Sequence, residues 1–390
     1  MIPYGRQHLD EGDVKAVVET LTSNWLTQGP AIPKFETALA DYCGAEFGVA
    51  VNSATSALHI ACLALGVGED DLVWTSPNSF VASSNCALYC GASVDFVDID
   101  LQTGNMCIKA LKQKLEHAQN INTLPKVVIP VHFAGQPCDM ESLHVLAKQF
   151  GFYVIEDASH AIGAKYKGAF IGSGQYADIC VFSFHPVKII TTMEGGMALT
   201  NNSVWAEKMR MLRSHGITNN PEMMTEESHG PWYYQQISLG FNYRMTDVEA
   251  ALGLSQLDKL EVFLEKRNAL AAHYDRLFSE CETITPLKQN ADSYSSYHLY
   301  VVRIDSLTDK QHADLVTNLR EQGIFAHVHY IPIHMQPYYK NLGFKLGDFP
   351  NAEHYYQQAV TLPLFPDLTL EEVEQVVDTL SNAVNTVNSK

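Results

Sequence analysis

The sequence predicts an α/β fold with a mostly parallel sheet, followed by a smaller α+β region. Two observations carry this prediction. Short continuous apolar runs alternate with helical stretches up to about residue 205, and the alternation stops after about residue 245. Strand alternating with helix requires right-handed crossovers, which place helices on both faces of a parallel sheet. We therefore expect a large domain in residues 1–250, and a bridging helix with a small C-terminal domain in residues 251–390.

In the first part of the chain, strands and helices are expected in alternation. The expected helices cover residues 54–64, 80–89 and 140–150. The expected strands cover residues 72–74, 93–97, 126–131, 153–155 and 179–182. Apolar residues are continuous along these strands, as is typical of strands that are covered on both faces.

A long helix is expected to open the C-terminal part. Thr246 and Glu249 match a capping box, and helical spacing continues from there to about Phe278. A helix of that length is suited to bridge two domains. Beyond it we expect a strand at residues 297–302. Two helices should follow, one at residues 310–322 and one that begins at the Thr369/Glu372 capping box.

Composition and charge exclude several classes of protein. The 390 residues are 46% hydrophobic and 18% charged, which indicates a globular protein with a sizeable core. A net charge of −18 disfavours binding to nucleic acid or to an anionic membrane. The N-terminus has no basic stretch followed by an apolar one, and no apolar run approaches about 18 residues, so we expect neither secretion nor a membrane span. Eight scattered cysteines without a Cys-x-x-Cys pair indicate reduced thiols in the cytoplasm.

An acidic and a basic residue follow two expected strands. Asp157 comes just after the strand at 153–155, and Lys188 follows the strand at 179–182. Ligands of open α/β sheets bind at this edge. A lysine there can form a Schiff base with pyridoxal 5′-phosphate (PLP), and a carboxylate can keep the pyridine nitrogen protonated. Taken alone, each residue has a simpler interpretation: Asp157 could cap the next segment, and Lys188 could be a surface lysine. Lys188, however, is flanked by apolar residues, which is unusual for a solvated lysine.

Small and hydroxyl residues open the expected helix at 54–64. Ala54, Thr55 and Ser56 follow an apolar run, and backbone N–H groups at such a helix start can bind a phosphate. An ordinary helix cap explains the same residues equally well.

Three other patterns are weaker. Residues 172–177 fit a dinucleotide-binding fingerprint, but they precede a strand, so a tight turn is expected. His327, His329 and His334 have no acidic or cysteine ligand nearby, so we expect no metal. The polar run at residues 222–229 is either a solvated loop or a flap over a ligand.

Five motifs together resemble the DegT/StrS-type sugar aminotransferases of PLP fold type I, over essentially the whole chain. They lie at residues 25–30, 52–58, 156–163, 182–188 together with 194–196, and 240–245. The resemblance implies PLP as cofactor, a mostly parallel seven-stranded sheet in the large domain, and a homodimer with shared active sites.

The resemblance also implies a role for individual residues. Lys188 carries the cofactor, Asp157 pairs with the pyridinium nitrogen, and His160 contacts the hydroxyl side of the ring. Phe80 stacks on the ring, and Asn242 reaches the phosphate from the partner subunit. The other phosphate contacts implied are Ala54, Thr55, Ser56 and Ser183.

Residues 52–58, 182–185 and 328–333 resemble most closely the family branch of pseudaminic acid biosynthesis. That branch uses L-glutamate to aminate C4 of UDP-2-acetamido-2,6-dideoxy-β-L-arabino-hexos-4-ulose. The implied sugar contacts are Tyr4, Asn24, Trp25, Leu26, Thr27, His327, Val328, His329 and Tyr330. Met193 is a departure, because many family members carry a small residue there.

Several other functions are alternatives to a sugar aminotransferase. A related sugar dehydratase that uses pyridoxamine phosphate has histidine in place of the lysine, whereas Lys188 is present. A non-catalytic regulator is opposed by the intact set of Lys188, Asp157 and His160, and a nicotinamide oxidoreductase by the misplaced glycine motif. Among aminotransferases, enzymes for the D-xylo epimer of the sugar or for a dTDP-linked 3-keto sugar remain alternatives.

Overall fold

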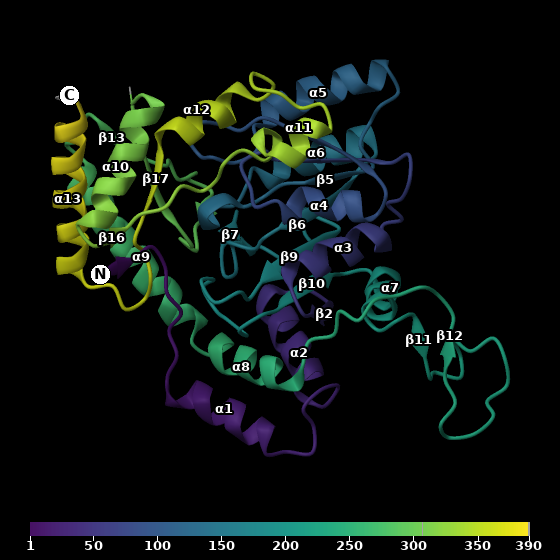
Figure 1. Ribbon diagram of the computed structural model, residues 1–390. Coiled ribbons are helices and arrows are strands. Elements are labelled where there is room, and N and C mark those ends of the chain that lie inside the picture. Colours follow the sequence, from purple (N-terminus) through teal and green to yellow (C-terminus); the bar gives the residue numbers. More distant parts are fainter. Residues whose placement is uncertain (306, 389–390) are drawn as a thin grey trace.

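A computed structural model, which describes residues 1–305 and 307–388, has a seven-stranded sheet at its centre (Figure 1). In spatial order the strands are β2 (Phe47–Val51), β10 (Gly196–Thr200), β9 (Ile179–Ser183), β6 (Tyr153–Asp157), β5 (Val127–Ile129), β3 (Leu72–Thr75) and β4 (Ser93–Phe96). Strand β10 is antiparallel to both of its neighbours, and the remaining adjacent pairs are parallel. The expected α/β class and mostly parallel seven-stranded sheet are confirmed.

Helices cover both faces of this sheet. Successive side chains of a strand point to opposite faces, so each strand contributes to two apolar clusters. Val73, Val127 and Ile155 belong to one apolar cluster, and Trp74 and Val128 belong to the other. The first cluster includes residues of α3 (Ala54–Ala64), α4 (Ala82–Tyr89) and α7 (Ser203–Arg213). The second includes residues of α2 (Ala31–Cys43), α5 (Ile108–Asn120) and α6 (Met140–Phe150). Each fully buried large aliphatic side chain contributes about 2 kcal/mol.

An ion pair fixes the edge strand β2 between two of these helices. Glu36 of α2 pairs with Arg213 of α7. The Glu36 carboxylate also accepts a hydrogen bond from the Ala50 N–H at 2.8 Å, and Arg213 donates to the Ala50 carbonyl at 2.6 Å. Removing one partner of such a buried pair typically costs about 3 kcal/mol. This pairing therefore holds the strand that leads into α3.

The C-terminal part has its own sheet and apolar cluster. Strands β13 (Ile284–Pro286), β15 (Tyr300–Ile304) and β17 (Ala359–Leu362) are antiparallel. They pack with α10 (Asp309–Glu321) and α13 (Leu370–Asn388), which lie together on the left of Figure 1. Strand β1 (Ile2–Pro3) pairs in parallel with β16 (Ile324–Phe325), which ties the N-terminus to this part.

Smaller elements complete the chain. These are α1 (Glu11–Leu21), the short strands β7 (Lys165–Tyr166), β8 (Ala169–Phe170) and β14 (Ser293–Tyr294), the helices α11 (Pro337–Asn341) and α12 (Pro350–Gln358), and the 3₁₀ turns Phe133–Gly135 and Ile333–Met335. No helix in the part of the chain that the structure describes is long and apolar enough to cross a membrane.

The prediction of one long bridging helix is wrong. The segment is two helices, α8 (Asp247–Leu257) and α9 (Leu260–Phe278), although the Thr246/Glu249 capping box is present. At the break, the Lys259 ammonium group bonds Asp10 at 3.0 Å and Asp13 at 2.5 Å, so contacts with α1 compete with helix continuity. The division at residue 250 stays a prediction.

The strand expected at 297–302 begins only at Tyr300, because Tyr297 has a positive φ of 45°. Strands β5, β6 and β9 differ from expectation by a residue or two at their ends.

An arm formed by residues 217–240 projects from the body of the molecule (Figure 1). Its short strands β11 (Ile217–Thr218) and β12 (Gln235–Gln236) are antiparallel, and residues 222–229 form an irregular loop between them. Trp232, Tyr234 and Leu239 of the arm are exposed. A monomer seldom exposes such a group of large apolar side chains.

Candidate active site

A cavity of about 440 Å³ opens at the carboxyl edge of the central sheet. Asp157 is the last residue of β6, and Ser183 is the last residue of the adjacent strand β9. The two strands are in register where Asp157 lies opposite Val181, and the Ala158 N–H donates to the Val181 carbonyl at 2.9 Å. Lys188 lies on the turn after β9, so neighbouring strand ends bring Lys188 and Asp157 to one cavity.

Two hydrogen-bond donors orient the Asp157 carboxylate. The Ser83 hydroxyl donates at 2.6 Å, and the Ser159 N–H donates at 3.1 Å. Ser83 is itself 2.7 Å from the Ser79 hydroxyl. Asp157 is buried, so its oxygens depend on these donors in place of water.

Lys188 is the basic residue of this cavity. Burial lowers the pKa of Lys188 from its ordinary value to about 8, although the negative charge of Asp157 acts in the opposite direction. A substantial part of the amine is therefore neutral near physiological pH, which is the form that a nucleophile or a base requires.

Three buried histidines lie at this site: His160 and His329 line the cavity, and His298 packs against His160. Burial, with help from the nearby Lys188 charge, lowers the pKa of His160 and of His298 well below the ordinary value, and lowers that of His329 to about 3. All three are thus neutral imidazoles. The Nε2 atom of His160 lies 3.2 Å from the Tyr330 hydroxyl, while its buried Nδ1 has no hydrogen-bond partner within the described residues.

The start of α3 forms one wall. Ser53 caps the helix by accepting a hydrogen bond from the Ser56 N–H at 3.1 Å. Gly196 approaches this turn so closely that a Cβ at position 196 would lie 2.5 Å from the Ala54 nitrogen. Ala54 and Thr55 line the cavity, but the Ser56 hydroxyl donates to Asn52 at 2.7 Å, and Ser56 does not line it.

Aromatic residues form the rim. The Phe80 side chain lines the cavity and is 60% exposed, which leaves a flat ring available for stacking. Tyr4, His327, His329 and Tyr330 also line it. The rings of Tyr4 and His329 lie 5.2 Å apart, and His329 Nδ1 is 2.9 Å from the Thr361 hydroxyl.

Other predicted site residues lie away from this cavity in the single chain. Asn242 is exposed beside the arm, and Asn24, Trp25, Leu26 and Thr27 are exposed in the segment before α2. Val328 is adjacent to the rim without lining the cavity. His334 bonds Glu353 at 2.9 Å and is likewise absent from the lining.

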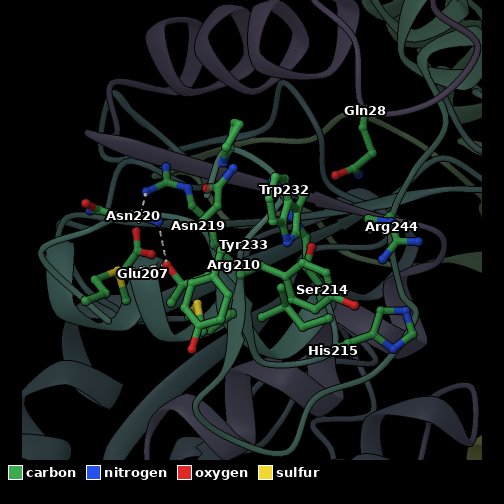
Figure 2. A pocket seen from close by; sticks show the side chains of 17 residues that line it. Gln28, Glu207, Arg210, Ser214, His215, Asn219, Asn220, Trp232, Tyr233 and Arg244 are labelled. Atoms are coloured by element: carbon green, nitrogen blue, oxygen red, sulfur yellow. Dashed lines mark hydrogen bonds and ion pairs between the residues drawn. The ribbon is translucent and has the colours of Figure 1, made fainter. Parts of the chain in front are cut away.

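A second cavity, of about 600 Å³, lies at the base of the arm (Figure 2). Its lining includes Gln28, Arg210, Arg213, Arg244 and Trp232. Arg213 is committed to Glu36, whereas Arg244 makes no ion pair among the residues that the structure describes. Gln28 comes from the segment at 25–30, and Arg244 from the segment at 240–245.

Sequence reasoning missed several residues of the main cavity. His185 and Glu194 line it, Ser83 binds Asp157, and His298 lies behind His160. Ser83 and His298 are distant in sequence from the Asp157 and Lys188 motifs, so no local pattern marks them. Met193 has a φ of 72°, a left-handed conformation that favours glycine and explains why a small residue suits this position.

This donor set fits PLP. The cavity offers a partly neutral lysine amine, a buried carboxylate and an unpartnered imidazole nitrogen. The helix start beside Gly196 offers N–H groups for a phosphate.

Comparison with known proteins identifies the family. Residues 7–381 match the DegT/DnrJ/EryC1/StrS aminotransferase family. The chain belongs to this family. It is 38% identical over 389 residues to the UDP-4-amino-4,6-dideoxy-N-acetyl-beta-L-altrosamine transaminase of Campylobacter jejuni, with 99% of this chain and 98% of that protein covered.

Solved structures agree with the sequence relatives. Helicobacter pylori PseC, an aminotransferase involved in the biosynthesis of pseudoaminic acid, has a TM-score of 0.90 at 34% identity, with 99% of both chains covered. The PMP form of the putative sugar aminotransferase Spr1654 from Streptococcus pneumoniae has a TM-score of 0.90 at 32% identity, covering 99% of this chain and 100% of that one. A PLP form of Spr1654 is also similar. The protein is a PLP-dependent sugar aminotransferase.

The lowered pKa of Lys188 predicts the pH dependence of cofactor uptake. A neutral Lys188 amine would attack the PLP aldehyde, so covalent uptake by the apoenzyme should accelerate about tenfold per pH unit at low pH and level off above pH about 8. Stopped-flow absorbance checks this, with Lys188→Ala as the control for surface lysines. A rate that kept rising to the ordinary lysine pKa of 10.5 would contradict the burial argument.

Proposed function

We propose that this transaminase transfers the amino group of L-glutamate to C4 of UDP-2-acetamido-2,6-dideoxy-β-L-arabino-hexos-4-ulose, in pseudaminic acid biosynthesis. The observation that carries the proposal is the likeness to PseC over 99% of both chains, with a TM-score of 0.90. The similar protein from Campylobacter jejuni, a UDP-4-amino-4,6-dideoxy-N-acetyl-beta-L-altrosamine transaminase, supports the same sugar.

In this proposal, residues in and beside the main cavity hold the cofactor. Lys188 carries the cofactor, Asp157 holds a proton at the pyridine nitrogen, and His160 contacts the hydroxyl side of the ring. Phe80 stacks on the ring. The phosphate is bound by Ala54, Thr55, Ser56 and Ser183. The Ser56 hydroxyl donates to Asn52 and its N–H donates to Ser53, so a phosphate contact of Ser56 would replace one of these two bonds.

When bound, PLP supplies a ring that withdraws electrons from the carbon that loses a proton. Once glutamate has displaced Lys188 from the cofactor, the freed neutral amine would take that proton from the α-carbon of glutamate, and its low pKa suits it to this task. Ser83 keeps Asp157 aimed into the cavity. Aromatic and imidazole groups at the rim limit the access of water. The same residues then serve in the reverse direction, when the keto sugar receives the amino group.

The sugar is proposed to lie against Tyr4, His327, His329 and Tyr330, which together line the rim. The neutral His329 imidazole and the phenol groups of Tyr4 and Tyr330 supply hydrogen bonds without a net charge, as a sugar requires. A chain with a net charge of −18 must bind an anionic diphosphate through local donors. We infer that Arg244 supplies one such donor, because it lines the second cavity and is unpaired among the described residues.

We infer a homodimer with shared active sites. Asn242 is exposed and absent from the lining of its own chain's main cavity, so a contact with a cofactor phosphate requires a second subunit. Asn24, Trp25, Leu26, Thr27 and Val328 are assigned to the same shared sugar site. Trp25 and Leu26 are exposed, as are Trp232 and Leu239 of the arm, and an interface would cover such side chains. The eight free cysteines lead us to propose the cytoplasm as the location.

Shared sites predict complementation between two inactive variants. Lys188→Ala should lose at least about three orders of magnitude in turnover, and Asn242→Ala should bind the cofactor weakly. Their hybrid dimer has one site with both native residues, so the mixture should recover part of the wild-type activity. Each variant re-equilibrated with itself is the control. A verified hybrid that stayed inactive would show that Asn242 acts within its own subunit.

The substrate is tested by a side-by-side assay with L-glutamate. We expect the highest kcat/KM for the UDP-linked L-arabino 4-keto sugar, because the similar proteins include an altrosamine transaminase and PseC. The D-xylo epimer and a dTDP-linked 3-keto sugar are the comparison substrates. A higher kcat/KM for the D-xylo epimer would overturn the sugar configuration, and a preference for the dTDP-linked sugar would overturn both the C4 and the UDP assignments.

A further inference from the structure

A second imidazole packs against His160. The ring centroids of His160 and His298 are 4.4 Å apart, with an interplanar angle of 44°. Both side chains are buried, and neither Nδ1 atom has a hydrogen-bond partner within the described residues. The two histidines come from different parts of the chain, His160 from the turn after β6 and His298 from the segment before β15. Their contact is therefore one of ring packing.

A buried arginine holds the segment that carries His298. Arg267 of α9 is 1% exposed and donates to the carbonyls of Tyr297 at 3.2 Å and His298 at 3.3 Å. It also donates to the Leu364 carbonyl at 3.0 Å. Burial lowers the pKa of Arg267 to about 10, so it remains charged at neutral pH. Its three carbonyl bonds fix the backbone of residues 297 and 298 from the side of α9.

The opposite side of this segment is held by the turn after β5. The Ser296 N–H donates to the Gly135 carbonyl at 3.1 Å, and the Leu299 N–H donates to the Ala134 carbonyl at 3.2 Å. A Cβ on Gly135 would lie 2.9 Å from the His298 nitrogen, so the contact requires glycine. The Ser296 hydroxyl also donates to the His160 carbonyl at 2.8 Å, which links the two histidine segments directly.

Tyr330 and His298 contact the His160 imidazole in different ways. The Tyr330 hydroxyl bonds Nε2 at 3.2 Å, and the His298 ring packs against the imidazole. With Nε2 bonded to Tyr330, Nδ1 is the buried ring nitrogen of His160 that has no partner among the described residues. Burial lowers the pKa of His298 well below its ordinary value, and the charges of Lys188 and Arg267 act in the same direction, so this neighbour is a neutral ring.

We propose that His298 is a positioning residue for the cofactor: its ring, held by Arg267 and the Gly135 turn, fixes the orientation of His160 toward PLP. The proposal rests on the role of His160 given under the proposed function. It does not depend on which sugar is aminated.

Three variants test the proposal through the cofactor itself. His298→Ala removes the ring, and His298→Phe keeps a neutral ring. His312→Ala is the matched control, because His312 is a buried histidine with a lowered pKa in α10, outside the cavity. The readouts are the visible absorption maximum of the bound cofactor, the Kd of the apoenzyme for PLP from fluorescence, and the thermal midpoint of the apoenzyme.

We expect His298→Ala to shift the absorption maximum and to weaken PLP binding roughly tenfold, and His298→Phe to restore both toward wild type. His312→Ala should lower the thermal midpoint alone. A His298→Ala variant with a lower thermal midpoint but a wild-type spectrum and Kd would overturn the proposal, since that is the pattern of a purely structural residue.

A His160→Ala background separates failure of this inference from failure of the His160 assignment. If His298 acts through His160, the effect of His298→Ala on PLP binding should vanish there. An unchanged effect in that background would overturn the inference while His160 keeps its role. A His160→Ala single variant with normal cofactor binding and spectrum would overturn the His160 assignment, and with it the inference.

Discussion

The parallel pairing of β6 with β9 decides where the chemistry of this protein lies. Parallel strands of one sheet end at the same edge, so the residues that follow them meet there whatever their separation in sequence. Asp157 ends β6 opposite Val181 of β9, and the turn after β9 carries Lys188. The antiparallel strand β10 begins at this edge with Gly196, against the first turn of α3. A slip of one residue in the β6–β9 register would turn Asp157 toward the opposite face of the sheet.

Burial then tunes the groups that this geometry collects. Desolvation penalises charge, so it leaves the cavity with neutral imidazoles and a lysine whose pKa is near 8. The buried Asp157 carboxylate is instead supplied with two donors. The result is a site with few charged side chains, which suits a cofactor and a substrate that are themselves charged. The net charge of the whole chain matters less here than the few donors that are placed locally.

Elements of the fold that depend on local sequence patterns could be predicted. Continuous apolar runs predicted the strands, and the Thr246/Glu249 capping box predicted the start of α8. Asp157 and Lys188 were also predictable, because residues directly after parallel strands share one edge. Ser83 and His298 were not, since tertiary packing alone brings them to Asp157 and His160. The break before α9 depends on the contact of Lys259 with α1, and the irregular backbone at Tyr297 lies in the segment held by Arg267. Such long-range contacts leave no periodic signal.

The central claim is that Lys188, at the carboxyl edge of the sheet, carries the cofactor covalently. Borohydride reduction of the PLP-loaded enzyme converts the bond between the cofactor and its lysine into a stable secondary amine, which peptide mass spectrometry locates. We expect one phosphopyridoxyl group per subunit, on the peptide that contains Lys188, and loss of that modified peptide in Lys188→Ala. Stoichiometric modification of any other lysine in the wild type would contradict the account.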